Sequence, residues 1–135
     1  MSNPNKRKGT AWETAVKDFL NVALGQYVDD WEPGAYYWRD PRDPDNITRP
    51  AQTGAKDVGD LHAWPFVLEC KAERSITLAD YVRQANREAM HAGYPYGVAV
   101  VKAPRRATAD GYVVMDLGTF ARVLDTLRSA GRNSE

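Results

Sequence analysis

The sequence is poor in several features that would point to particular classes of protein. Its 135 residues include one cysteine, which excludes an internal disulfide and favours a reducing compartment. No apolar run reaches the roughly 18 residues of a membrane span. Lys and Arg together number 18 and balance 18 acidic residues, so the surface is not basic throughout, although a local basic patch leaves no trace in that sum. We expect an intracellular, cytoplasmic protein without membrane contact.

Internal repeats and long low-complexity tracts are also absent. The length fits one domain that buries most of its apolar surface. The basic N-terminus has no apolar segment behind it, so no secretory signal is expected. We predict a single domain over residues 1–135, with flexible tails at 1–8 and 131–135 and a long irregular loop at 32–56, rich in Pro, Asp, Arg and Gly.

Three amphipathic helices are expected where apolar residues recur three and four positions apart. The first covers residues 10–24, with Thr10 as N-cap and Gly25 as its stop, and the second covers residues 77–92 and ends at Gly93. The third covers residues 118–131. Its buried side is predicted to carry Phe120, Val123, Leu124 and Leu127.

Strands are expected between these helices. A short one is possible at 26–31, and the segments 57–64 and 65–73 form a hairpin that turns at Trp64-Pro65. The continuous apolar run at 96–104 is typical of a central strand covered on both faces, and 111–117 supplies another strand. This order of elements predicts an α/β structure around a mixed sheet.

Charged residues gather at the predicted hairpin. Side chains alternate between the two faces of a strand, so Glu69 and Lys71 point the same way at the end of an apolar run. The turn position places Asp60 almost opposite Glu69. Two carboxylates so close repel each other unless a positive charge lies between them, and a Mg²⁺ ion is a candidate. The alternative is a strand edge that surfaces into water, because Glu and Lys are common residues.

These residues resemble the signature of the PD-(D/E)xK nuclease superfamily, in which an Asp and a strand hairpin precede (Asp/Glu)-x-Lys. The matching residues are Asp60 and Glu69-Cys70-Lys71; "DVGD" also offers Asp57, but an apolar strand directly follows Asp60. The stretch 6–16 is similar to the opening of archaeal-type Holliday junction resolvases, where a helix carries a metal-site Glu, here Glu13. Size and motif layout also resemble the small junction resolvases encoded by mycobacteriophages.

The resemblance implies a restriction-endonuclease-like fold, an αβββαβ core whose mixed central sheet is flanked by helices. It also implies a Mg²⁺ cofactor, replaceable by Mn²⁺, a homodimer with two sites for symmetric cleavage, and the host cell cytoplasm if a phage encodes the chain. The implied metal ligands are Asp60, Glu69, the backbone carbonyl of Cys70, and Glu13. The implied catalytic residues are Glu13, Asp60, Glu69, Lys71 and Gln84, the last matching a Gln that borders the site in many relatives.

Two of these residues have simpler interpretations. Glu13 stands three residues after Thr10, where it completes a capping box. Gln84 can be an ordinary solvated residue of the second helix. Thr53, beside Gly54, matches a loop that contains a serine in the resolvases.

Basic residues form three groups that are candidates for DNA binding. The alternative for each group is a solvated face. Next to Arg39 stands the aromatic run 36–38, which can stack on unpaired bases or, equally, cover a sheet edge. The candidate DNA-binding residues are Lys6, Arg7, Lys8, Arg39, Arg42, Thr53, Arg105 and Arg106.

These features predict a metal-dependent endonuclease that cuts branched DNA, such as a four-way Holliday junction. The metal stabilises the transition state, and Lys71 activates the attacking water. One alternative keeps the fold and changes the substrate to duplex ends, flaps or restriction-like sites. Another is a DNA-binding module without catalysis.

Overall fold

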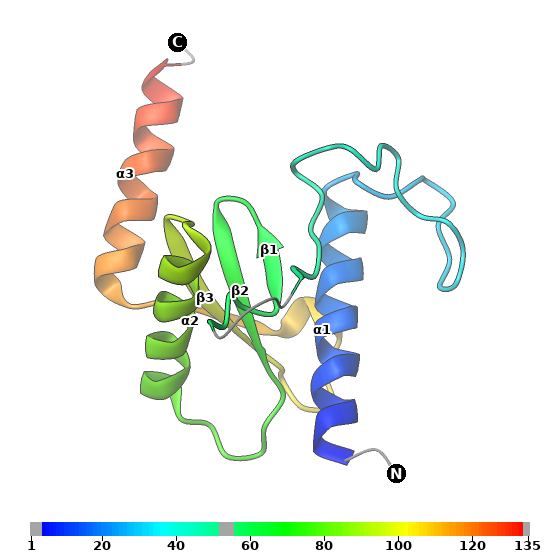
Figure 1. Ribbon diagram of the computed structural model, residues 1–135, viewed down its shortest axis with the longest axis horizontal. Coiled ribbons are helices and arrows are strands. Elements are labelled where there is room, and N and C mark those ends of the chain that lie inside the picture. Colours follow the sequence, from blue (N-terminus) through cyan, green and yellow to red (C-terminus); the bar gives the residue numbers. More distant parts are fainter. Residues whose placement is uncertain (1–3, 52–55, 134–135) are drawn as a thin grey trace.

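The computed structural model describes residues 4–51 and 56–133 and shows a mixed α/β structure (Figure 1). Four strands form one sheet in the order β1-β2-β3-β4, with β2 and β3 parallel and both outer pairs antiparallel. In Figure 1, α1 lies on one side of the sheet and α2 and α3 lie on the other. The elements are α1 (Pro4–Ala23), β1 (Leu61–Ala63), β2 (Phe66–Lys71), α2 (Leu78–Ala92), β3 (Tyr96–Val101), the 3₁₀ helix η1 (Thr108–Asp110), β4 (Tyr112–Val114) and α3 (Leu117–Asn133).

The predicted hairpin is confirmed. β1 and β2 pair with Leu61 opposite Leu68, and the turn between them contains a cis peptide bond at Trp64-Pro65. The predicted central strand is also confirmed, because every residue of β3 is buried. No helix in the described ranges is long and apolar enough to span a membrane.

The predicted first helix begins too late. Residues 4–8, expected in a flexible tail, already belong to α1, so Thr10 lies inside the helix and is not its N-cap. Pro4 at the start accounts for the early beginning, because its fixed φ suits the first helical position and its missing N–H is not needed there. Its buried face is formed by Trp12 and Val16, while Phe19 and Val22 are exposed.

Trp12 joins α1 to the sheet, where its indole Nε1 donates a hydrogen bond of 2.9 Å to the carbonyl of Val100. The main apolar core lies on this face of the sheet and includes Val16, Leu68 and Val98. A smaller cluster on the α2 face contains Tyr81, Ala99 and Val101.

α2 lies unusually close to β3, and a glycine makes this possible. A Cβ atom at Gly97 would stand 2.1 Å from the carbonyl oxygen of Ala85, so no other residue fits without moving the helix. As predicted, Gly93 ends α2 in the left-handed conformation, and its N–H bonds to the last turn. The β2–β3 pair and α2 therefore form a tightly packed frame for the end of β2.

The prediction that Phe120 and Leu127 lie on the buried side of α3 is wrong. Phe120 and Leu127 are 47% and 64% exposed, and Thr119 is the buried residue of this helix. Polar contacts attach α3 to the body, since the Tyr96 hydroxyl donates to the carbonyl of Arg122 and Asn86 of α2 donates to Asp116, just before the helix, at 2.8 Å. The helix also continues to Asn133, so residues 131–133 are not a flexible tail.

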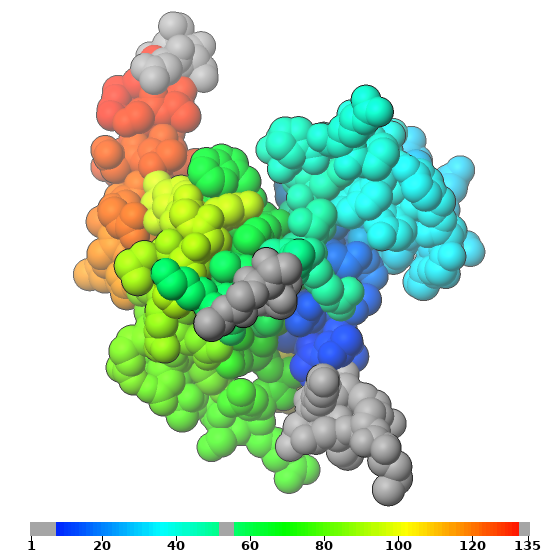
Figure 2. All heavy atoms as spheres, viewed as in Figure 1, coloured from blue at the N-terminus to red at the C-terminus, as the bar shows by residue number. Residues whose placement is uncertain are grey.

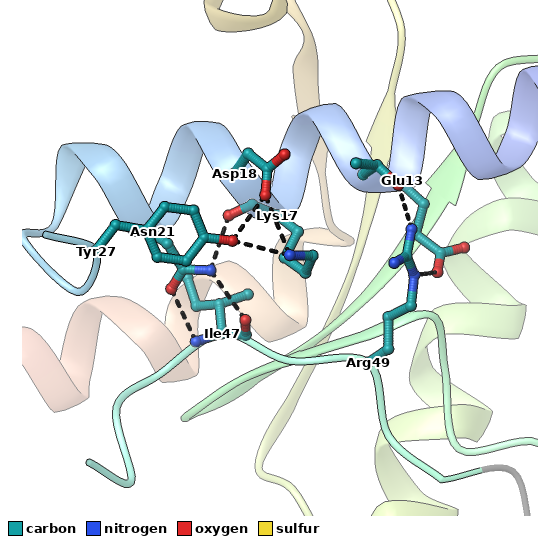
Figure 3. Close-up of polar contacts among 8 residues, drawn as sticks. Glu13, Lys17, Asp18, Asn21, Tyr27, Ile47 and Arg49 are labelled. Carbon is teal, nitrogen blue, oxygen red and sulfur yellow. Dashed lines mark hydrogen bonds and ion pairs between the residues drawn. The ribbon is translucent and has the colours of Figure 1, made fainter. Parts of the chain in front are cut away.

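The irregular loop is confirmed in its described part. Residues 24–51 contain no helix or strand, and Figure 2 shows them as a lobe beside one end of α1. Asn21, fully buried, ties the returning chain to α1, because its side chain both donates to the Ile47 carbonyl and accepts the Ile47 N–H (Figure 3). The strand predicted at 26–31 is reduced to one bridge, Tyr27 to Trp38, and a second bridge joins Thr48 to His62 beside β1.

Candidate functional site

The end of β2 presents its side chains to two different faces of the sheet. Cys70 belongs to the core between the sheet and α1. Glu69 and Lys71 face α2, since the Lys71 ammonium lies 3.5 Å from Glu69 Oε1 and 5.3 Å from the ring centre of Tyr81 on α2. The predicted alternation of Glu69 and Cys70 between the faces is therefore confirmed.

Asp60 lies beside this strand end, where the hairpin begins. The register of Leu61 with Leu68 continues to place Asp60 opposite Glu69. Its Oδ2 accepts the backbone N–H of Cys70 at 2.7 Å. Burial, followed by the negative charge of Glu69, raises the pKa of Asp60 to about 7, although the N–H of Cys70 acts in the opposite direction.

Glu69 is the most constrained acid of the site, with 5% of its surface exposed. Its Oε2 is buried without a hydrogen-bond partner in the described part of the chain. Burial, followed by the proximity of Glu88, raises the pKa of Glu69 to about 8, while Lys71 lowers it in part. This carboxylate consequently binds a proton or a cation more readily than an ordinary glutamate does.

Glu13 approaches from α1. Its Oε1 accepts a hydrogen bond of 2.6 Å from Arg49 Nε, and Arg49 also bonds to the hydroxyl of Thr14 (Figure 3). Its charge acts on Asp60, so the two acids belong to one electrostatic cluster. In this structure the side chain of Glu13 is paired with an arginine of the irregular loop rather than with the backbone of a helix start.

Two further acids complete the cluster: Glu88, which was not assigned to the site from the sequence, and Asp57, which the sequence offered as the alternative to Asp60. Glu88 on α2 is 2% exposed, and Asp57 lies just before the hairpin. One oxygen from each of Asp57, Glu69 and Glu88 lies within 4.8 Å of the others. Gln84 Nε2 donates to Glu88 Oε1 at 3.0 Å, so Gln84 holds this acid in place. The signal was present in the sequence, because Glu88 is one helical turn beyond Gln84.

A polar cavity of about 780 Å³ opens beside Lys71. Lys8 of α1, Lys71 and Arg74 line it together with Glu73, so three cationic side chains and one acid border this space. Lys6 and Arg7 belong to the first turns of the same helix. Of the predicted DNA-binding residues, Lys8 lines this cavity beside the predicted catalytic Lys71.

Other predicted DNA-binding residues lie elsewhere. Arg39 is engaged within the loop, where it bonds to the Gly25 and Tyr27 carbonyls and pairs with Asp29. Arg42 is exposed on the same loop. Arg105, with a φ of 61°, and Arg106, paired with Asp110 at 3.3 Å, lie exposed between β3 and η1, and Thr53 lies outside the described residues.

The aromatic run of the loop packs neither on a sheet edge nor wholly in solvent. Tyr37 and Trp38 contact the buried Tyr27, with ring centres 5.0 and 5.1 Å apart, and form a small core of the lobe. Tyr36 remains 67% exposed beside them. A single aromatic face is therefore available to solvent.

Comparison with known proteins adds no relative. The chain matches no protein-family model, no curated protein and no solved structure. The chemistry of the site is thus read from its own residues.

Proposed function

We propose that this chain is a divalent-metal-dependent DNA endonuclease that cuts branched DNA, with a four-way junction as its main substrate. The observation that carries the proposal is the pair of facing acids at a strand end, the half-buried Asp60 and the buried Glu69, beside the ammonium of Lys71. Buried carboxylates with raised pKa values next to a specific cationic partner are characteristic of catalytic sites. We further propose that the chain is related to the PD-(D/E)xK nucleases and shares their restriction-endonuclease-like topology.

The residues fit a hard divalent cation. Glu69 Oε2 is a buried oxygen without a hydrogen-bond partner in the described ranges, and the groups that would hold a cation offer oxygen atoms. Asp60, Glu69 and the backbone carbonyl of Cys70 would hold Mg²⁺ or Mn²⁺, with Glu13 as a further ligand once released from Arg49. When bound, such an ion polarises a phosphate oxygen and lowers the pKa of a coordinated water.

Lys71 is suited to act on the attacking water or on the charge that develops on the phosphate. It lies between two acids, Glu69 at 3.5 Å and Glu73 at 3.9 Å, which hold its ammonium in place. Gln84 acts through Glu88 and is a positioning residue. Together these contacts keep the catalytic groups in a fixed arrangement before substrate arrives.

DNA phosphates would enter the cavity that Lys8, Lys71 and Arg74 line. Tyr36 on the lobe supplies an exposed aromatic ring of the kind that stacks on unpaired bases at a branch point. Symmetric cleavage of a junction requires two sites, so the proposed active form is a homodimer. The proposed location is the cytoplasm, that of the host cell if a phage encodes the chain.

A cleavage assay on labelled four-way junctions, with Mg²⁺ and with EDTA, tests the proposal. Wild type should cut only with the metal, whereas Glu69→Ala and Lys71→Ala should lose at least about a hundredfold in rate and still bind the junction. Glu32→Ala, an exposed acid on the lobe, is the matched control and should cut normally.

The same assay separates the alternatives. If flaps, duplex ends or linear duplexes are cut in preference to the four-way junction, the proposed substrate is wrong and the proposed cleavage chemistry still holds. Binding without Mg²⁺-dependent cleavage of any substrate would make the chain a DNA-binding module. Normal cutting by Lys71→Ala would show that the assigned site is wrong.

A further inference from the structure

The acids extend past the proposed Asp60 metal site toward α2. Asp57, Glu69 and Glu88 come from three separate segments, and one oxygen of each lies within 4.8 Å of the others. Glu69 belongs to both groups, because it also lies opposite Asp60. A space bounded by three carboxylates is thus adjacent to the site already described.

Two of these acids point buried oxygens at the cluster. Oε2 of Glu69 and Oε2 of Glu88 are both inaccessible to solvent, and neither has a hydrogen-bond partner among residues 4–51 and 56–133. Each side chain interacts with the other, and a carboxylate can donate a hydrogen bond only when it carries a proton. When both carboxyls are ionised these oxygens have no donor, and a bound cation or a shared proton supplies the missing partner.

Their remaining oxygens are occupied. Glu88 Oε1 accepts from Gln84, and Glu69 Oε1 faces Lys71. Asp57 Oδ1 accepts the Gly59 N–H at 2.9 Å. The three carboxylates are therefore held in place by neighbours, each through one oxygen.

The chain just before β1 runs close to the sheet and to Glu88. Gly59 has a φ of 95°, and a Cβ there would stand 2.2 Å from Val67 Cγ1 and 3.5 Å from Glu88 Oε2. Only glycine adopts this turn against the sheet, and the turn brings Asp57 back over α2. A cavity of about 320 Å³ borders the cluster, and it is lined by Asp57, Gln84 and Glu88 together with Asp80, Arg83, Arg87 and His91.

We propose that Asp57, Glu69 and Glu88 bind a second divalent cation of the hard class, Mg²⁺ or Mn²⁺, with Glu69 shared between it and the Asp60 site. All three ligands are carboxylate oxygens, which these ions prefer and which offer nothing to soft metals. The inference deepens the proposed function through the shared Glu69, yet cation binding at Asp57 and Glu88 is measurable without DNA. In catalysis, two neighbouring cations stabilise both the attacking and the leaving oxygen.

Calorimetric titration of Mn²⁺ into the metal-free full chain at pH 8 tests the proposal. Wild type should bind two Mn²⁺ ions per chain. Glu88→Gln, which keeps an oxygen for Gln84, and Asp57→Asn, which keeps one for Gly59, should each bind one. Asp60→Asn should also bind one ion, and Asp80→Asn, an exposed acid of the same cavity paired with Arg83, should bind two.

Thermal unfolding with and without Mn²⁺ gives a second readout. It uses Asp57→Asn, because Asp57 is exposed and this substitution removes no buried group, so the test remains valid even if Glu88→Gln folds poorly. Mn²⁺ should raise the melting temperature of Asp57→Asn less than that of wild type. Wild-type stoichiometry in Asp57→Asn and Glu88→Gln would overturn this inference and leave the proposed nuclease intact. If wild type binds two Mn²⁺ ions and each substitution removes one, but the chain cuts no DNA, the second cation site is supported and the proposed nuclease activity is wrong.

Discussion

At the scale of single residues, Glu69 connects the two parts of the acidic cluster. It lies opposite Asp60 on one side, contacts Glu88 on the other and pairs with Lys71 at the strand end. Its position follows from strand alternation, which sends Cys70 into the core and keeps Glu69 and Lys71 on the α2 face. Burial makes its negative charge unfavourable without a cation, so the residue links proton binding, metal binding and stability.

The first consequence concerns pH. The pKa values of Asp60 and Glu69 are raised to about 7 and about 8 from ordinary values of 3.8 and 4.5, so between pH 4 and 8 the folded chain holds protons that the unfolded chain has lost. Without divalent metal, stability is therefore greatest at the acidic end of this window, as far as these two groups decide it, and falls as pH rises toward 8.

Thermal unfolding in EDTA at several pH values measures this effect. Glu69→Gln should flatten the decline and unfold at a higher temperature than wild type at pH 8, because a neutral amide replaces the buried charge. Asp45→Asn, an exposed acid on the lobe, should leave the pH profile unchanged. A wild-type profile that rises from pH 5 to 8, with the same slope in Glu69→Gln, would contradict the assignment.

At the scale of elements, the site depends on how α1, the loop and the hairpin are held together. Asn21 is the main joint between α1 and the returning loop, with hydrogen bonds to Lys17 and to both backbone groups of Ile47. Two residues after Ile47 comes Arg49, which pairs with Glu13. A polar side chain in the core thus sets where the loop meets the candidate site.

Asn21→Ala should destabilise the protein by about 2–4 kcal/mol, since it leaves the buried N–H and carbonyl of Ile47 without their partner. Denaturant unfolding measures this loss. Limited proteolysis should then cut the lobe at 24–51 faster than in wild type, because its attachment to α1 is weakened. Val22→Ala, an exposed neighbour on the same helix, should change stability by less than about 0.5 kcal/mol. Equal losses of stability in Asn21→Ala and Val22→Ala would show that Asn21 does not hold the loop to α1.

At the scale of the whole molecule, α3 stands out because it extends beyond the sheet (Figure 1). Its apolar residues Leu117, Phe120 and Leu127 are exposed, while polar contacts near Tyr96 and Asp116 attach its first half. An apolar helix face of this kind is typical of an association surface. In the proposed homodimer, α3 offers the exposed apolar side chains of Leu117, Phe120 and Leu127 to a second copy.

Sedimentation at micromolar concentration tests this arrangement. Wild type should sediment as a dimer, and Leu127→Glu should sediment as a monomer, because the substitution places a charge in an apolar contact. Arg128→Glu, the next residue on the same helix, changes charge without removing apolar surface and should remain dimeric. A monomeric wild type, or a dimeric Leu127→Glu, would place the interface elsewhere or remove the dimer from the proposal.

Local features of this protein were predictable because neighbouring residues decide them. The hairpin at Trp64-Pro65 follows from two apolar strand segments around a turn, and the end of α2 follows from the freedom of Gly93 at positive φ. The shared face of Glu69 and Lys71 follows from the two-residue period of a strand.

Contacts between distant segments required the tertiary structure. The sequence places Glu88 one helical turn beyond Gln84, but the contact of its carboxylate with Glu69 and Asp57 depends on how closely Gly97 lets α2 approach the sheet. The apolar stripe of α3 predicted burial, but a periodic pattern tells only that a helix has an apolar face, not whether the same chain covers it. The sequence by itself determined the elements and the strand end, and the packing of α1, α2 and the loop around that end determined the acidic cluster.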